Sequence, residues 1–320
     1  MQRHRQSPEA DHITPDAVQG SWVDRAPAAA RPYLRLSRMD RPIGTWLLLL
    51  PCWMGLLLAM LHSGQAGLHD AWIAAGCAIG ALLMRGAGCT WNDITDRDFD
   101  GAVERTAARP IPSGQVTVRG AAVWMAAQAL ASLCILLTFN WAAIGLGIVS
   151  LLPVAIYPFA KRFTWWPQVF LGLAFNWGAL LAWTAHSGSL GWPAVTLYVA
   201  GILWTLFYDT IYAHQDTEDD ALIGVKSTAR LFAEQTPRWL MYFLIGAVTM
   251  MGFAVIQAAA GRNILSLVIA IGGPWAFGWH LNWQLRQFAP DDSALLTRIF
   301  RSNRDAGLLA VLFFAVALLL

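Results

Sequence analysis

Two acidic segments carry residue types and spacings that could bind a divalent cation. The first reads N-D-I-T-D-R-D-F-D and places Asn92, Asp96 and Asp100 at intervals of four residues. On a continuous helix these three side chains share one face, with neighbours about 6 Å apart, whereas Asp93 is expected to point elsewhere. Like charges at this spacing destabilise a bare helix, so the segment needs a counter-charge. Mg²⁺ is the usual partner of such oxygen ligands, and the alternative is a solvated acidic loop.

The second acidic segment reads Y-D-T-I-Y-A-H-Q-D-T-E-D-D. Asp216 and Asp220 again lie four residues apart, and Asp209 lies about two helical turns before Asp216. An ionisable group at the end of an apolar span is costly and is usually functional. Because Mg²⁺ typically bridges carboxylates to substrate phosphates, the two segments predict a diphosphate ligand held by two or more Mg²⁺ ions. We expect the two segments to face each other across a helical bundle.

Basic residues near both acidic segments agree with an anionic ligand. They could clamp a diphosphate and stabilise the charge that develops as it leaves. Taken singly, each one is more simply explained as a charge that only sets membrane topology. His214, between Asp209 and Asp216, could support a metal ligand from behind. The candidate diphosphate contacts are Arg105, Arg109, Lys161, Arg162 and Lys226.

The composition indicates that most of the surface faces lipid. Of the 320 residues, 57% are hydrophobic and only 13% are charged, whereas a soluble domain normally carries about 25% charged residues. The net charge of +2 gives no excess of basic residues of the kind that nucleic-acid-binding proteins show. We therefore expect the lipid bilayer as a partner, and no nucleic acid.

Apolar runs of roughly 16 to 22 residues recur along the chain, close to the length that crosses the hydrocarbon core. They predict an all-α, polytopic membrane protein, with about nine transmembrane helices bundled around a central cavity and with cytoplasmic cap loops. Residues 1–30 are expected to form a disordered polar tail, and residues 31–320 the transmembrane domain. The predicted spans are 43–61, 71–91, 118–138, 141–159, 166–185, 193–213, 238–259, 264–283 and 305–320.

The connectors between these spans alternate in charge. One set carries only Arg262 of the 22 lysines and arginines. The positive-inside rule puts the other set, with both acidic segments, in the cytoplasm. The tail contains acids and no apolar core, unlike a signal or transit peptide. We therefore expect a bacterial inner membrane, with the mitochondrial inner membrane as the alternative.

The pattern N-D-x-x-D-x-x-x-D at 92–100 with D-x-x-x-D at 216–220, on a nine-span chain, resembles the UbiA superfamily of intramembrane aromatic prenyltransferases. The resemblance extends over about residues 33 to 320, and its flanking segments are similar to the 4-hydroxybenzoate polyprenyltransferase branch. These segments are R-P-I-G at 41–44, R-T-A-A-R-P-I-P-S-G at 105–114, Y-P-F-A-K-R at 157–162, Y-D-T-I-Y-A at 208–213 and I-G-V-K-S-T-A at 223–229.

The resemblance implies a Mg²⁺-dependent transfer of a polyprenyl chain from polyprenyl diphosphate to the ring of 4-hydroxybenzoate. The new carbon–carbon bond forms beside the hydroxyl, as the prenylation step of ubiquinone biosynthesis. Arg109, Lys161 and Lys226 would contact the diphosphate. An extra acid, Asp219, beside Asp220 leaves the second ligand set open. By motif position, the metal-binding residues would be Asn92 and the catalytic aspartates Asp96, Asp100, Asp216 and Asp220.

Further roles concern the acceptor and the allylic cation. Arg41 is the candidate for holding the carboxylate of the acceptor. Asp209 could position Mg²⁺-bound water or assist proton removal, and Tyr212 could shape the acceptor pocket. Apolar and aromatic helix faces would keep water from the cation, while the prenyl tail leaves sideways into lipid.

Other functions remain open at this level. A divalent-cation transporter also needs carboxylates, but such sites usually lie near the bilayer midplane, and Arg105, Arg109 and Lys161 would not help a cation pathway. A phosphotransferase of lipid head groups needs metal and diphosphate too, but its usual acidic pattern, beginning with D-G and containing an A-R pair, is not found in the sequence. Within the superfamily, the acceptor could also be haem, chlorophyllide or a naphthoate.

Overall fold

The computed structural model describes residues 20–100, 104–222 and 224–320, which are helical and contain no β-strand. It describes their side chains except at 98–100, 104, 105 and 219. The chain divides into two compact units. The first unit comprises residues 1–44 and 82–133, and the second comprises residues 45–81 and 134–320.

The first unit is a small helical assembly around a short apolar core. Leu36, Ile111, Val116 and Ala121 are buried in it, and Tyr33, Ile94 and Trp124 pack against them. Its elements are η2 (Trp22–Arg25), α1 (Arg31–Leu36), the C-terminal part of α3 (Leu68–Asp100), α4 (Glu104–Ala107) and most of α5 (Val118–Leu136).

Helical structure is present before residue 31, where the sequence analysis places the start of the folded domain. Val23 in η2 is fully buried. Asp24 forms an ion pair with Arg35, with 3.1 Å between Oδ1 and Nη2. The prediction of disorder through residue 30 is therefore wrong for η2, because an apolar residue and a charge partner tie this segment to α1. Residues 1–19 lie outside the described part of the chain.

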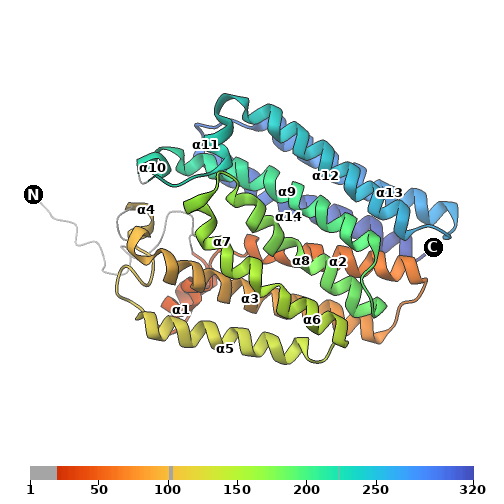
Figure 1. The fold of residues 1–320 in the computed structure, drawn as a ribbon, viewed down its shortest axis with the longest axis horizontal. Helices are drawn as coiled ribbons and strands as arrows, with labels where there is room; N and C mark the ends of the chain where they lie inside the picture. The colour runs from red at the N-terminus through yellow and green to blue at the C-terminus, as the bar shows by residue number, and fades with distance from the viewer. Residues whose placement is uncertain (1–19, 101–103, 223) are drawn as a thin grey trace, which may run out of the picture. The chain divides into compact units, whose positions relative to one another are not determined.

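The second unit is a bundle of long helices. Within it, α9 packs against α8, α12 and α14, and α13 packs against α12 and α14 (Figure 1). Its elements are most of α2 (Ile43–Ser63), the start of α3, α6 (Trp141–Val149), α7 (Leu151–Phe163), α8 (Pro167–Ser187), α9 (Trp192–Ala213), η3 (His214–Asp216), α10 (Thr217–Leu222), α11 (Thr228–Phe232), η4 (Ala233–Gln235), α12 (Thr236–Ala258), α13 (Ile264–Gln287) and α14 (Ser293–Leu318).

Close approach of helices and buried polar pairs hold this bundle together. A Cβ at Gly55 of α2 would collide with the backbone of Ala179 in α8, so the glycine lets the two helices touch. The buried Asn176 donates to Thr205 at 2.8 Å and so links α8 to α9. Apolar association contributes little free energy to helix packing in lipid, so close packing and interhelical hydrogen bonds are expected to stabilise such a bundle.

Eight helices among the described residues are long and apolar enough to cross a membrane, which confirms an all-α membrane protein with a span number near nine. The ninth predicted span is the apolar half of α14, which starts at Ser293 rather than 305 and carries several charges in its first half. The predicted span 141–159 consists of α6 and α7, which meet at Ser150. Pro153 explains this break, because it cannot donate a helical hydrogen bond to residue 149.

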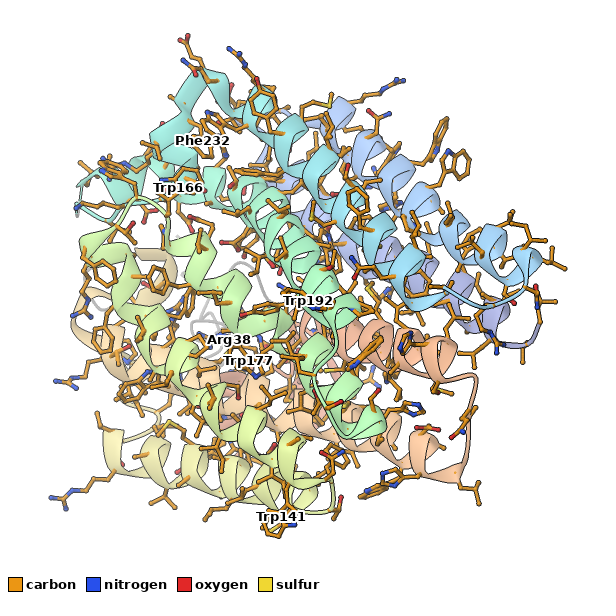
Figure 2. All side chains as sticks on the ribbon, turned by 45° about the vertical axis from the view of Figure 1, so that its right-hand side comes forward. Arg38, Trp141, Trp166, Trp177, Trp192 and Phe232 are labelled. Carbon is orange, nitrogen blue, oxygen red and sulfur yellow. The ribbon has the colours of Figure 1, made fainter. Side chains whose placement is uncertain are left out.

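Exposed tryptophans mark where helices of the second unit begin. Trp141 opens α6 and Trp192 opens α9, and their side chains are largely exposed (Figure 2). Tryptophan favours the interface between membrane and water, so both residues suit an anchoring role there.

Candidate functional site

The first acidic segment forms the C-terminal end of α3. The helix runs without a break to Asp100, which confirms that it continues through the motif. Its 33 residues give a length of about 50 Å, well beyond the roughly 30 Å hydrocarbon core. Asp96 is buried and Asn92 is partly buried. The side chain of Asp100, and that of Arg105 in α4, lie outside the described part of the chain.

Asp93, which was expected to point away from this row, is buried together with its neighbour Asp96. Its carboxylate is fully buried, as is that of Asp96. The two residues are three positions apart, and side chains at this spacing also share a helix face. The motif therefore presents two buried carboxylates on neighbouring turns of α3.

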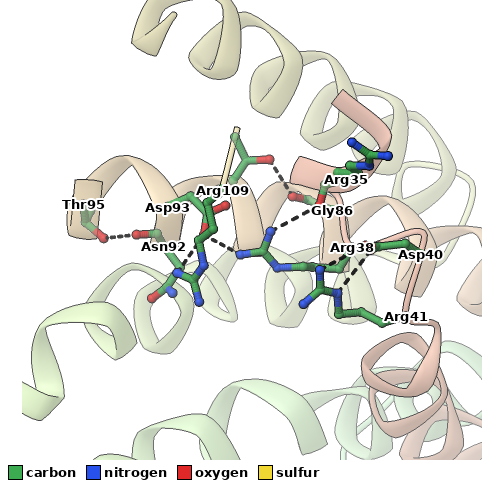
Figure 3. A network of polar contacts seen from close by, with 10 residues as sticks. Arg35, Arg38, Asp40, Arg41, Gly86, Asn92, Asp93, Thr95 and Arg109 are labelled. Atoms are coloured by element: carbon green, nitrogen blue, oxygen red, sulfur yellow. Dashed lines mark hydrogen bonds and ion pairs between the residues drawn. The ribbon is translucent and has the colours of Figure 1, made fainter. Parts of the chain in front are cut away.

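Two arginines neutralise Asp93 (Figure 3). Arg38, just after α1, donates from Nη2 to Oδ1 of Asp93 at 2.6 Å. Arg109 donates from Nη1 to the same oxygen at 3.3 Å. A buried carboxylate needs such partners, because an uncompensated charge in a low-dielectric interior is very costly. The predicted diphosphate contact Arg109 is thus fixed to the first acidic motif itself.

Tight turns hold Arg109 in place. The amide of Arg109 donates to the carbonyl of Thr106 at 2.9 Å. The amide of Ser113 donates to the carbonyl of Arg109 at 3.0 Å. The amide of Val116 closes the turn on the carbonyl of Pro110 at 3.0 Å. Ile111, next in the chain, is buried in the core of the first unit, so the backbone of this segment is anchored on both sides of Arg109.

Arg41 is held by its neighbour Asp40. Two guanidinium nitrogens donate to the two carboxylate oxygens, Nε to Oδ1 at 3.2 Å and Nη2 to Oδ2 at 3.0 Å. Asp40 is buried. This fork fixes the plane of the guanidinium, which is the property needed to recognise a carboxylate. Its role toward the acceptor stays a prediction.

The second acidic segment follows α9 in the second unit. Asp209 lies in the last turns of α9, Asp216 ends η3 and Asp220 lies in α10. All three side chains are partly buried. The helix changes to a 3₁₀ turn at His214–Asp216, so the segment is not one uninterrupted α-helix.

A polar seam docks the segment after α10 onto the bundle. Thr210 of α9 and Thr228 of α11 share a buried hydrogen bond of 2.6 Å. The amide of Thr228 donates to Oε1 of Gln168 in α8 at 3.2 Å. Phe232 of α11 packs edge-on against Trp166, with ring centroids 5.3 Å apart (Figure 2). These contacts fix both ends of α11 against the bundle.

A backbone hydrogen bond links the same segment to a second predicted cation. The amide of Lys226 donates to the carbonyl of Lys161, at the end of α7, at 3.1 Å. The ammonium of Lys226 lies 6.0 Å from the ring centre of Trp165, and the guanidinium of Arg230 lies 5.4 Å from it. Arg162 is exposed, and its guanidinium lies 5.1 Å from the ring centre of Phe159.

Arg230 is an organising residue that the sequence analysis missed. It donates from Nη1 to the carbonyl of Asp220 at 3.2 Å and also to the carbonyl of Val225. The amide of Val225 donates to the carbonyl of Asp220 at 2.9 Å. No sequence signal marks this role, because the side-chain hydrogen bonds of Arg230 go to backbone carbonyls.

Aromatic rings line the helix that carries Asp209. Tyr212 stacks on Phe300 of α14, with centroids 4.3 Å apart and an interplanar angle of 29°. Tyr208 packs against the same ring at 5.7 Å, and its hydroxyl lies 3.1 Å from that of Thr205. His214 hydrogen-bonds to the carbonyl of Thr210 at 2.8 Å, which gives it a structural role at the end of α9.

The donor chemistry of the two segments fits Mg²⁺, because Asn92, Asp96, Asp216 and Asp220 offer amide and carboxylate oxygens. Among the side chains that the structure describes, no three His, Cys, Asp or Glu come close enough to hold a metal ion. Asp100 and Asp219 belong to the segments but fall outside those side chains. The metal ligands therefore stay predictions.

An all-helical membrane chain with two aspartate-rich segments and cationic side chains beside them has the features of an intramembrane transferase acting on a diphosphate. The model of the UbiA prenyltransferase family matches residues 48–304. The chain belongs to this family.

Curated relatives are similar to this chain over most of its length. The mitochondrial 4-hydroxybenzoate polyprenyltransferase of Rattus norvegicus is 47% identical over 293 residues, which cover 91% of this chain and 75% of the relative. The Homo sapiens protein of that name is 45% identical, covering 91% and 76%. The one from Arabidopsis thaliana is 43% identical, covering 94% and 72%.

Solved structures share the fold. A UbiA homologue from Aeropyrum pernix K1 superposes with a TM-score of 0.65 at 23% identity, covering 86% of this chain and 96% of the other. A UbiA homologue from Archaeoglobus fulgidus, solved with GPP and Mg²⁺, gives 0.64 at 19% identity, covering 90% and 100%. At these identities the likeness bears on the fold alone.

Proposed function

We propose that this chain transfers a polyprenyl chain from a polyprenyl diphosphate to the ring of 4-hydroxybenzoate, ortho to its hydroxyl, in ubiquinone biosynthesis. The observation that carries this proposal is the 43 to 47% identity to 4-hydroxybenzoate polyprenyltransferases over at least 91% of the chain. The helical membrane fold supports it, because a long prenyl tail needs an apolar environment.

Mg²⁺ is the proposed cofactor. Asn92, Asp96, Asp100, Asp216 and Asp220 would hold it, and when bound it would neutralise the diphosphate and make it a better leaving group. The chemistry of these side chains supports this role, because Mg²⁺ prefers oxygen ligands.

Cationic side chains would bind the diphosphate directly. A backbone hydrogen bond joins Lys226 to Lys161, so the loop that carries Lys226 is held against the end of the helix that carries Lys161. Arg109 is held beside the first acidic motif. Arg105 and Arg162 complete the set as more peripheral contacts. As the bond between the prenyl carbon and the diphosphate oxygen breaks, these cations would stabilise the charge on the departing group.

The acceptor would be oriented by its carboxylate and deprotonated after attack. Arg41, with its guanidinium plane fixed by Asp40, would bind the carboxylate of 4-hydroxybenzoate. The ring carbon beside the hydroxyl attacks the allylic carbon, and the proton on that ring carbon then leaves. Asp209 would accept that proton, and Tyr212, stacked on Phe300, would shape the pocket wall.

The membrane in which the protein resides is a separate question. The helices support an integral membrane protein. We expected a bacterial inner membrane, but the relatives are named as mitochondrial, which supports the mitochondrial inner membrane instead. Fractionation of cells that express the full chain would decide between the two.

The test is transfer of labelled 4-hydroxybenzoate into lipid. Membranes containing the chain would be incubated with polyprenyl diphosphate, the labelled acceptor and Mg²⁺, with EDTA and Asp96→Ala as controls. Lipid label that is lost in both controls supports the reaction and the metal role. Label only with a naphthoate, haem or chlorophyllide acceptor would keep the family and refute this acceptor. Folded protein that transfers to no acceptor would refute prenyl transfer and reopen cation transport.

A further inference from the structure

Arg38 occupies a backbone conformation that normally belongs to glycine. Its φ is +57°, in the left-handed region. Its amide donates to the carbonyl of Arg35 and the amide of Met39 donates to that of Leu34, both at 3.0 Å. This is the hydrogen-bond pattern of a Schellman motif that ends α1, and glycine is the preferred residue at the position Arg38 takes. A side chain here costs free energy, so some other contact must compensate.

The side chain of Arg38 makes that contact. It is 9% exposed and donates to the fully buried carboxylate of Asp93 at 2.6 Å, a short charge-assisted bond (Figure 3). The neighbouring Ser37 packs closely on Gly86 of α3, and Trp124 of α5 donates to its hydroxyl at 2.7 Å. These contacts fix the end of α1 against α3 and α5, and they place the side chain of Arg38 within hydrogen-bonding distance of Asp93.

Asp93 is shared unequally between its two arginines. Arg38 is the closer and more buried partner, whereas Arg109 lies at 3.3 Å and is 18% exposed. Arg38 is therefore the main counter-charge of Asp93. A guanidinium has five N–H donors in a rigid fork, and Asp93 takes one of those of Arg109.

We infer that Asp93 and Arg38 are positioning residues that orient Arg109 toward the diphosphate of the prenyl donor. Asp93 then serves as an anchor for a cation and not as a metal ligand, unlike Asp96 on the next turn. The inference deepens the proposed function and depends on its assignment of Arg109 to the diphosphate. It also explains why an arginine occupies a position where the backbone favours glycine.

The test compares Asp93→Asn, Arg38→Gly and Arg109→Gln in the full chain. Two quantities are measured: the steady-state constants for both substrates, and the Kd of a non-hydrolysable prenyl diphosphonate in the presence of Mg²⁺. Asp93→Asn should raise the Kd of the diphosphonate about tenfold and lower kcat/KM for polyprenyl diphosphate by at least that factor. The KM for 4-hydroxybenzoate should not change. The double variant with Arg109→Gln should bind no more weakly than Arg109→Gln alone.

Arg38→Gly keeps the test decisive if Asp93→Asn fails to fold. Glycine relieves the backbone at this position, so the variant should fold and still show the same rise in Kd. Arg38→Lys, which keeps a charge beside Asp93, should show a smaller rise. Asp305→Asn, which breaks the exposed pair with Arg304, is the matched control and should leave the Kd unchanged.

Three results would overturn the inference. They are an unchanged Kd in Arg38→Gly, full additivity of Asp93→Asn with Arg109→Gln, or a higher Mg²⁺ requirement in Asp93→Asn with an unchanged Kd. If the wild-type chain binds the diphosphonate but does not prenylate 4-hydroxybenzoate, the proposed acceptor is refuted. The Kd series then still decides the positioning role.

Discussion

Removal of the Arg230 guanidinium should loosen the loop that carries Lys226. Arg230→Ala deletes two hydrogen bonds from a charged donor, to the carbonyls of Asp220 and Val225, and the contact with Trp165. Each such hydrogen bond contributes about 1.5 kcal/mol at the lower end of its range, and less here because the side chain is partly exposed. The cation–π contact adds about 0.5 kcal/mol. We therefore expect a loss of about 2 kcal/mol of loop docking, which is a factor of about 30.

The assay follows from what the loop does. If Lys226 binds diphosphate only when the loop is docked, the apparent affinity falls with the docked fraction. We expect the KM for polyprenyl diphosphate to rise by up to about 30-fold, with a smaller effect on the KM for 4-hydroxybenzoate. Amide hydrogen exchange over residues 224–230 should rise in parallel.

The matched control is Arg238→Ala. Arg238 also lies beside an aromatic ring, that of Tyr242 at 5.7 Å, but it is exposed and forms part of α12. It should change neither KM nor exchange at 224–230. An Arg230→Ala chain with normal exchange and a normal KM would show that the loop does not depend on this guanidinium, and the reasoning would fail.

Three further changes test other parts of the structure. Lys226→Gln should weaken prenyl diphosphate binding about tenfold, and Lys226→Arg should recover part of that loss, as steady-state KM values will show. Thr228→Val removes the 2.6 Å bond to Thr210 and should lower stability by about 1 kcal/mol, read from thermal unfolding in detergent. Asp70→Ala removes the 2.6 Å partner of His186 and should lower stability by about 1 to 3 kcal/mol. It should leave substrate KM values unchanged, because His186 lies about 27 Å along α8 from Gln168. Gln168 lies at the end of α8 that contacts Thr228 in α11.

Much of the fold could be predicted from the sequence, because the bilayer requires apolar helices of a particular length. Apolar runs long enough to cross hydrocarbon predicted nearly every long helix. The charged start of α14 was missed, since Arg298, Arg301 and Arg304 interrupt the apolar pattern. The break between α6 and α7 was missed for a different reason: proline can be tolerated within a transmembrane helix, so Pro153 alone did not predict a stop.

The candidate residues were predictable by type, but their local partners were not. The cations Lys161 and Lys226 were predicted as a group around the acids, and the structure joins them through a backbone hydrogen bond. Nothing in their spacing of 65 positions could have shown that contact. Arg230 was missed because its bonds go to backbone carbonyls, which every residue has, and so no sequence pattern marks them.

Residue spacing alone could not predict the surroundings of Asp93. Spacing of four residues groups Asn92 with Asp96, but spacing of three groups Asp93 with Asp96 just as well. Both aspartates are buried in the structure, while Asn92 is only partly buried. Asp93 is distinguished by its contact with Arg38, which lies 55 positions earlier in the chain. The left-handed backbone conformation of Arg38 could not be predicted from the sequence. The contact of Arg38 with Asp93 supports the proposal that Asp96, and not Asp93, is the metal ligand.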